Sequence, residues 1–262
     1  MMCSCPRLTP VVVLILVTAA VPVVAQTRSQ LLVTAVGSDP GPVDHLTPAD
    51  FVLSVGGVEL EVGDVEPLSD AVQIVAVFED LAVTQRQLND ALAQFIDHLD
   101  DETLLDMLSV DGTVDAAIIE AIDDLNTRRV PRPVIVMLGQ ASEIAPSELP
   151  SSQVRGRRRA ADLTGNVDQL AELVTDQGIL FYGVSITDVA LPSFERLARA
   201  GGGRFIRLED PSTLSEALAA VAFELESQYI VSYMAPPSTP LPDLEPARPG
   251  LRLRVAPFVP NP

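Results

Sequence analysis

Cysteine is nearly absent from this chain, since its two cysteines, Cys3 and Cys5, both lie within the first five residues. The rest of the chain therefore has no disulfide, no thiol nucleophile and no cysteine ligand for a metal. Aromatic residues are also few, at 4% of 262 residues, although 47% of the residues are hydrophobic. That is enough apolar surface to bury a sizeable core, so we expect the chain to fold and to rely on packing for its stability.

Basic residues are scarce as well. The chain has 17 Lys and Arg against 36 Asp and Glu, which gives a formal net charge of −19. Binding to a phosphate backbone requires an excess of positive charge on the contact face. The composition therefore excludes nucleic acid as an expected partner.

The N-terminus has the pattern of a secretory signal peptide. Arg7 lies in a short polar lead, residues 11–24 form an apolar run, and Val23 and Ala25 are small residues before Gln26. The run is shorter than the roughly 20 residues that a membrane-spanning helix needs, and no later segment is long and apolar enough to span. We therefore expect residues 1–25 to be removed and the mature protein to be periplasmic or extracellular.

The remaining chain divides into three parts. Residues 26–67 show short β-strands, with a hairpin expected at the Gly56-Gly57 pair between two β-branched runs. Residues 68–228 alternate buried strands with amphipathic helices, which predicts a doubly wound, mostly parallel α/β sheet with helices on both faces. Residues 229–262 contain two strands around a proline-rich loop. We expect the N- and C-terminal strands to pair into a small accessory β-layer.

The α/β segment contains five strand-helix units. The predicted strands are 72–78, 104–109, 134–138, 179–184 and 204–208, and the predicted helices are one centred on 88–99 and those at 114–125, 167–177, 192–200 and 211–228. Thr84 with Gln87 fits a capping box, and Asp210 before Pro211 fits a helix start.

Three segments of the chain match the pattern of one family. Residues 46–53 read L-T-P-A-D-F-V-L, residues 197–205 read L-A-R-A-G-G-G-R-F, and residues 224–233 read E-L-E-S-Q-Y-I-V-S-Y. In these motifs the chain resembles secreted bacterial proteins with a von Willebrand factor A-like domain, of the kind abundant in acidobacteria. The resemblance implies a Rossmann-like α/β fold and a role in protein–protein interaction or adhesion.

The family's metal-ion-dependent adhesion site is degenerate here. Its D-x-S-x-S motif corresponds to Asp80, Ala82 and Thr84, its threonine to Thr113, and its later aspartate to Gln140. Ala82 supplies no oxygen and Gln140 no carboxylate, whereas Mg²⁺ requires a near-octahedral oxygen shell. Thr84 and Thr113 are also explained as helix N-caps. We therefore expect no bound metal. The alternative is a Mg²⁺-dependent adhesion module whose shell is partly completed by water.

No catalytic arrangement is evident in the sequence. His45 lies in a turn-rich segment, and His98 is expected at the negative end of a helix. There is no G-x-S-x-G elbow and no H-E-x-x-H zinc pair. We expect a protein that is not an enzyme, and the remaining alternative is a periplasmic hydrolase with an unrecognised set of residues.

The candidate binding surface is formed by the loops at the carboxyl edge of the sheet. Residues 139–165 lack periodicity and contain the only dense basic run of an acidic chain, which favours an exposed loop that either is simply solvated or docks an acidic partner. We therefore expect an unidentified protein partner, and the candidate contacts are Gln140, Arg155, Arg157, Arg158 and Arg159.

Overall fold

A parallel sheet occupies the centre of the larger part of the molecule. A computed structural model describes residues 27–39, 41–79, 83–111, 113–139, 167–186, 191–236 and 240–257. The sheet has the strand order β6-β5-β7-β8-β9, and every neighbouring pair is parallel. Its strands are β5 (Val72–Phe78), β6 (Leu104–Ser109), β7 (Arg132–Gly139), β8 (Leu180–Ile186) and β9 (Phe205–Leu208).

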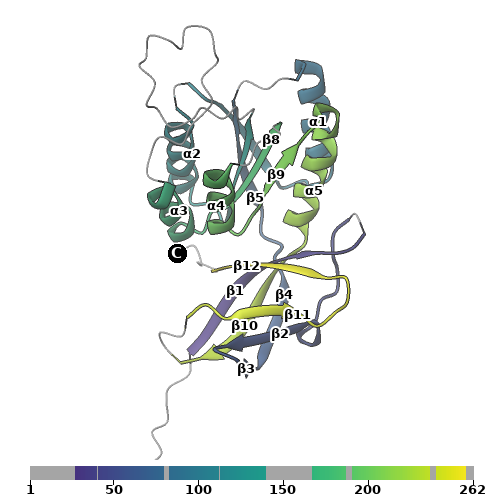
Figure 1. Cartoon of the computed structure of the whole chain (residues 1–262), viewed down its shortest axis with the longest axis vertical. Coiled ribbons are helices and arrows are strands. Elements are labelled where there is room, and N and C mark those ends of the chain that lie inside the picture. Colours follow the sequence, from purple (N-terminus) through teal and green to yellow (C-terminus); the bar gives the residue numbers. More distant parts are fainter. Residues whose placement is uncertain are drawn as a thin grey trace, which may run out of the picture.

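Helices cover both faces of this sheet (Figure 1). One face packs against α1 (Gln85–Asp97) and α5 (Leu214–Glu226), and the other packs against α2 (Val114–Arg128), α3 (Val167–Asp176) and α4 (Pro192–Ala200). Strands β5 and β7 are buried on both faces, because their continuous aliphatic runs contribute alternately to the two cores. The doubly wound α/β class expected from the sequence is confirmed.

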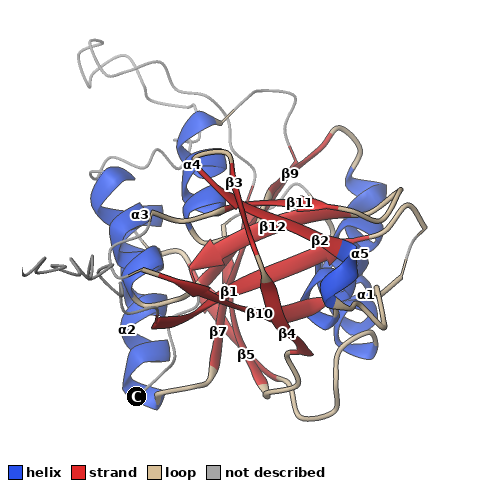
Figure 2. Ribbon diagram, turned by 90° about the horizontal axis from the view of Figure 1, so that it is seen from below, coloured by secondary structure: helices blue, strands red, loops and turns tan. Residues whose placement is uncertain are grey.

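Two antiparallel sheets form a second part below the α/β layers (Figures 1 and 2). They enclose a third core of aliphatic and tyrosine side chains. The larger sheet, in the order β12-β1-β10-β4, consists of β1 (Thr27–Val36), β4 (Val62–Pro67), β10 (Gln228–Ala235) and β12 (Arg252–Pro257). The smaller sheet, in the order β11-β2-β3, consists of β2 (Phe51–Val55), β3 (Val58–Leu60) and β11 (Asp243–Pro246), and short 3-10 turns lie at η1 (Pro48–Asp50) and η2 (Pro211–Thr213).

The expected accessory β-layer is therefore present, since β1 pairs with both β10 and β12. Two of its strands differ from the sequence-based expectation. The run after Gly56-Gly57, expected as the second strand of the hairpin, is divided into β3 and β4, and β4 pairs with β10 instead of with β2. Strand β11 lies within the segment expected to be only a proline-rich loop, where Pro246 is tolerated because β11 is an edge strand.

A buried arginine fastens the α/β layers to the β-layers. Arg132, at the start of β7, is 6% exposed. Its guanidinium donates to the carbonyl oxygens of Leu68 (3.2 Å), Asp70 (2.8 Å) and Leu225 (2.6 Å) and to Oε1 of Gln228 (2.9 Å). These acceptors belong to the β4–β5 connection, the end of α5 and the start of β10. One side chain therefore joins three segments at the boundary of the two parts.

Among the helices that the structure describes, none is long and apolar enough to cross a membrane.

Candidate functional site

The carboxyl edge of the parallel sheet is held together by main-chain bonds. The N–H of Glu79 donates to Leu138 O (2.9 Å), and the N–H of Val110 donates to Phe78 O (2.8 Å), so the ends of β5, β6 and β7 meet at one edge. Of the candidate site residues at this edge, only Thr84 and Thr113 are described. Asp80, Gln140 and the basic residues Arg155, Arg157, Arg158 and Arg159 lie outside the described residues.

The two threonines differ in how they cap the N-termini of their helices. Thr84 forms the expected capping box at the start of α1, because its hydroxyl accepts from Gln87 N–H (3.2 Å) and the Thr84 N–H donates to Gln87 Oε1 (3.0 Å). Thr113 occupies the N-cap position of α2, but its hydroxyl makes no capping bond. The interpretation of its hydroxyl as a cap is therefore wrong; the first turn of α2 forms through the Thr113 carbonyl, which accepts from Ala117 N–H (3.2 Å).

Glu79, directly after β5, brings a carboxylate to this edge. A Cβ placed on Gly139 would lie 2.9 Å from Oε2 of Glu79, so the Glu79 side chain rests against the end of β7. Within the described ranges, no group of three or more His, Cys, Asp or Glu side chains is placed to hold a metal ion.

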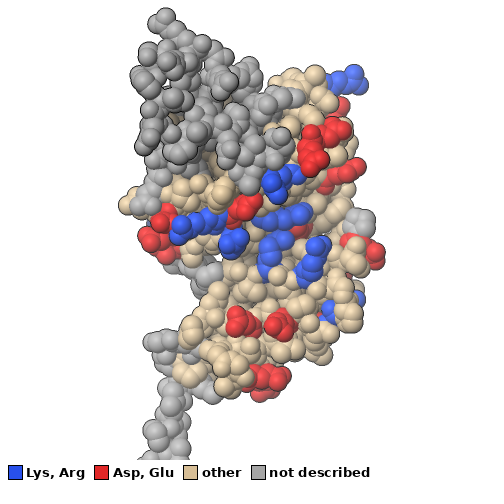
Figure 3. Space-filling model, viewed as in Figure 1, with Lys and Arg blue, Asp and Glu red and all other residues tan. Residues whose placement is uncertain are grey.

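Arginines gather elsewhere, at the waist between the α/β layers and the β-layers (Figure 3). The chain has no lysine, so all 17 of its basic residues are arginine. Four of them border two adjoining cavities of about 410 and 520 Å³, and Arg204 lines both. We call this set the arginine cluster; its members are Arg199, Arg204, Arg252 and Arg254.

A glycine turn after α4 places Arg204 in the cluster. Gly202 has φ +71°, which favours glycine, and a Cβ there would lie 2.5 Å from the Ala256 Cβ. A Cβ on Gly203 would lie 2.1 Å from the Phe181 carbonyl oxygen. Because both glycines approach neighbouring strands this closely, the chain can turn directly from α4 into Arg204 and β9. Their backbone also lines the smaller cavity.

A buried carboxylate holds two of the arginines. The Glu224 side chain, on α5, is 4% exposed, and its Oε1 lies 2.7 Å from Nε of Arg204. Its other oxygen pairs with Arg254 of β12. Burial raises the pKa of Glu224, because desolvation outweighs the attraction of Arg254 and Arg204. Two arginines sharing one carboxylate leave an excess of positive charge beside the smaller cavity.

The other two arginines of the cluster are exposed and form no ion pair with a described residue. Arg199 and Arg252 are exposed, and neither makes a hydrogen bond or ion pair with any residue in the described part of the chain. Glu195 also lines the smaller cavity, beside Arg199, Arg204 and Arg254, so three guanidinium groups face one free carboxylate there. The larger cavity is mixed, with Asp39 and Glu216 as further acidic neighbours.

This arrangement suits the recognition of an anion. A guanidinium presents planar, paired N–H donors that match the oxygens of a carboxylate or phosphate. The described lining residues of the smaller cavity include no Ser, Thr, Cys or His, whereas Ser38 lines the larger cavity. The chemistry that the arginines themselves offer is to bind and orient an anion.

His98 is accounted for by its place in the fold, as expected. It is the C-cap of α1; its Nδ1 lies 2.5 Å from Gln94 O, and its ring packs edge-on against Phe223 at a centroid distance of 4.9 Å. These contacts tie the end of α1 to α5.

The sequence interpretation missed the arginine cluster, although two signals were present. Glu224 is a charged residue on the face of α5 that otherwise buries Val221, Leu225 and similar side chains. A carboxylate there requires a buried cationic partner. Arg252 and Arg254 are two residues apart on β12, which places them on one side of the strand. Neither signal shows which segments come together.

Comparisons with known proteins give a likeness to solved structures and nothing more. No known family matches the chain, and no curated protein is similar to it. A solved structure described as von Willebrand factor type A from Catenulispora acidiphila is similar with a TM-score of 0.46 and 9% sequence identity, over 93% of this chain and 68% of that one. At this level the likeness assigns neither family nor function.

Proposed function

We propose that this chain is an exported, non-enzymatic binding protein with a von Willebrand A-like α/β domain, and that it holds an acidic segment of a partner protein at the arginine cluster. One observation carries the proposal. In a protein of net charge −19, Arg199 and Arg252 are exposed and make no hydrogen bond or ion pair with the described residues, and they lie next to two further arginines that share a single carboxylate.

The electrostatics favour an acidic partner with localised charge. The overall negative charge of this chain repels acidic molecules at long range, and repulsion between separated surface charges is screened at physiological ionic strength. Arg199 and Arg252 are exposed, so added salt also screens their attraction for the carboxylates of a partner. A partner must therefore present several carboxylates together, and its binding should weaken as salt is added.

The proposed function requires neither a metal nor catalysis. The three binding residues of the smaller cavity are arginines, which do not ligate metal cations, and the described lining contains no nucleophile. A chelator should therefore leave binding unchanged. Loss of binding in chelator would instead favour the Mg²⁺-dependent alternative around Asp80.

The test uses a fluorescent oligo-glutamate peptide, with an oligo-glutamine peptide of equal length as its control. We expect the Arg199→Ser/Arg252→Ser double variant to bind oligo-glutamate about tenfold more weakly, corresponding to roughly 1.4 kcal/mol. The matched control is Arg28→Ser/Arg86→Ser, which removes the same charge from two exposed ion pairs outside the cluster. Equal weakening in both variants would show a general charge effect and reject the site.

Export is tested separately. Expression of the full chain in a bacterial host with cell fractionation should give a periplasmic or secreted product whose N-terminal sequence begins at Gln26. A cytoplasmic product that retains Cys3 and Cys5 would reject export without affecting the binding assay.

A further inference from the structure

Strand β6 forms an unpaired border of the central sheet. It pairs only with β5, in parallel, from Gln73↔Leu104 to Phe78↔Ser109. In such an edge strand, alternate N–H and C=O groups point outward. No other strand among the described residues pairs with this outer side.

The apolar side chains of β6 are left partly uncovered on both faces of the sheet. Leu105 packs into the core beneath α1 and α5, whereas Leu108 packs into the core beneath α2. Their neighbours are exposed, Leu104 by 61% and Met107 by 67%. Because these two residues are an odd number apart, they lie on opposite faces. A strand added along β6 would cover both.

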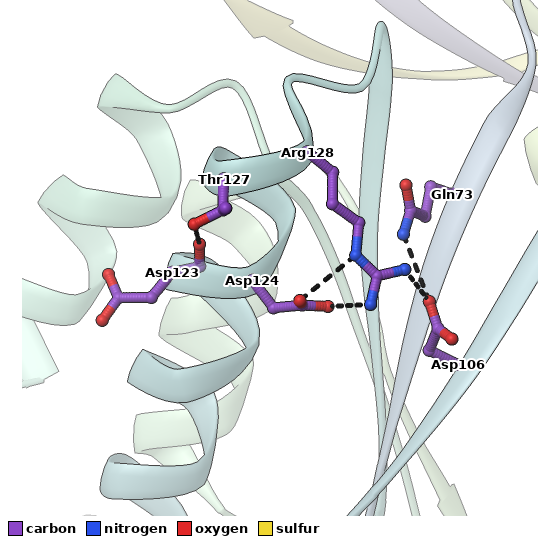
Figure 4. A network of polar contacts seen from close by, with 6 residues as sticks. All are labelled: Gln73, Asp106, Asp123, Asp124, Thr127 and Arg128. Atoms are coloured by element: carbon purple, nitrogen blue, oxygen red, sulfur yellow. Dashed lines mark hydrogen bonds and ion pairs between the residues drawn. The ribbon is translucent and has the colours of Figure 1, made fainter.

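The single charged residue of β6 is paired with a neighbouring side chain. Asp106 pairs with Arg128 of α2 and accepts from Nε2 of Gln73 (3.2 Å), as Figure 4 shows. Arg128 also pairs with Asp124, at 2.8 Å. A charge on an edge strand commonly discourages pairing with other chains, but the carboxylate of Asp106 is engaged by its own neighbours.

Other sheet edges of the molecule keep such protection. Strand β9, the opposite edge of the parallel sheet, is only four residues long and carries the exposed Arg207. Strand β11 contains Pro246, and β12 carries Arg252 and ends at Pro257. Strand β6 has six residues and contains neither proline nor a free charge.

The charge around β6 indicates its occupant. Residues 99–111 contain five acidic residues and no basic one, and Asp100, Asp101, Glu102 and Asp111 are exposed. In an antiparallel pair with a second copy, the acidic start of one strand would face the acidic end of the other, which is unfavourable. An extended segment with basic residues at both ends would be attracted instead.

We propose that β6 is a docking edge that accepts an extended polypeptide segment from a partner, with apolar side chains in the middle and basic residues at both ends. The segment adds as a sixth strand: its main chain bonds to the outward N–H and C=O groups of β6, and its apolar side chains cover Leu104 and Met107. This surface is independent of the arginine cluster.

The experiment uses the full chain and the labelled peptide RKVVVVVKR as the probe, whose valines lie on both faces of an added strand, with EEVVVVVEE as the charge-reversed control. We expect the basic peptide to bind and to slow hydrogen exchange of the amides in residues 104–109. Met107→Lys and Leu104→Lys should each weaken binding about tenfold, because they place like charge beside the peptide. The matched control is Val58→Lys on the edge strand β3, where Val58 is 66% exposed, and it should bind like the wild type.

The outcomes separate this proposal from its rivals. Binding that persists in Arg199→Ser/Arg252→Ser supports an independent surface, even if that variant has lost oligo-glutamate binding. Equal binding of the two peptides, or saturation without protection at 104–109, overturns the proposal. Protection at 104–109 that rises with protein concentration in the absence of peptide overturns it in favour of a second copy of this chain. Thermal unfolding of each variant confirms that it is folded.

Discussion

Arg128 and Arg132 lie four residues apart in the chain, but their side chains differ in burial and in the groups that they bind. Arg132 is 6% exposed and donates to three carbonyl oxygens and one amide oxygen in three segments. The side chain of Arg128 is 41% exposed and pairs with Asp106 and Asp124 at the surface (Figure 4). Three of the four bonds of Arg132 are buried, so its acceptors would lose a partner that water does not readily replace, whereas water can replace the partners of Arg128.

The arginine cluster contains both kinds of environment side by side. Arg204 and Arg254 are held by the buried Glu224, while Arg199 and Arg252 are exposed and form no hydrogen bond or ion pair within the described ranges. In this chain without lysine, arginine thus occurs in three environments. It is buried and bonded between the layers at Arg132, paired with carboxylates at the surface at Arg128, and exposed without an ion pair among the described residues at Arg199 and Arg252. Only the last kind is available to a partner without loss of internal contacts.

The largest effect is expected for Arg132→Met. The substitution fills a similar space but leaves the carbonyls of Leu68, Asp70 and Leu225 without their donor. We expect the free energy of unfolding to fall by about 3 to 5 kcal/mol, measured by urea denaturation followed by circular dichroism. Arg132→Lys should recover only part of the loss, because one ammonium group cannot reach acceptors spread over a guanidinium fork.

A change near zero in the free energy of unfolding for Arg132→Met would mean that water satisfies the three carbonyls and that Arg132 stabilises the fold no more than Arg128 does. Oligo-glutamate binding provides a second measurement. Arg132 lines neither cavity of the arginine cluster, so any folded fraction of the variant should bind the peptide with wild-type affinity.

A much smaller effect is expected for Arg128→Ala. Its two carboxylates remain partly solvated when the guanidinium is removed, so the free energy of unfolding should change by only a small fraction of the Arg132→Met value. The measurement is the same urea titration, repeated at high salt, where the difference from the wild type should shrink further. If Arg128→Ala lowered the free energy of unfolding as much as Arg132→Met, the ion pairs of Arg128 at the surface would be as important for stability as the buried bonds of Arg132.

The sequence predicted the α/β part more accurately than the β-layers. The expected strands at 72–78 and 104–109 and the helix at 192–200 coincide with β5, β6 and α4. Each of these elements has a local hydrophobic period that its burial requires. Strand β11 has no such signal, because Asp243–Pro246 acquires its structure only by pairing with β2, which is distant in the chain.

The arginine cluster was beyond sequence reasoning for the same reason. Arg204 follows α4, Arg252 and Arg254 belong to β12, and Glu224 belongs to α5. No spacing rule connects these positions, which meet because β12 returns to pair with β1 at the waist. The dense basic run at 155–159 was predicted as a binding surface because its arginines are contiguous in the sequence. A site assembled from three separate segments leaves no contiguous pattern.

The smallest effect on the free energy of unfolding at neutral pH is expected for Tyr182→Phe, a variant that tests how completely this side chain is buried. Burial, with the charge of Glu224 nearby, raises its pKa to about 12. A folded-state pKa above the unfolded value of about 10 means that the stabilising contribution of the neutral hydroxyl is complete below pH about 10 and is lost as the pH rises toward 12.

The chain has three tyrosines and no tryptophan, so tyrosinate absorbance reports these groups directly. We expect Tyr182→Phe to remove the highest ionisation step and to unfold less steeply with rising pH than the wild type. Ionisation of Tyr182 near pH 10 in the folded protein would show that water reaches the Tyr182 hydroxyl.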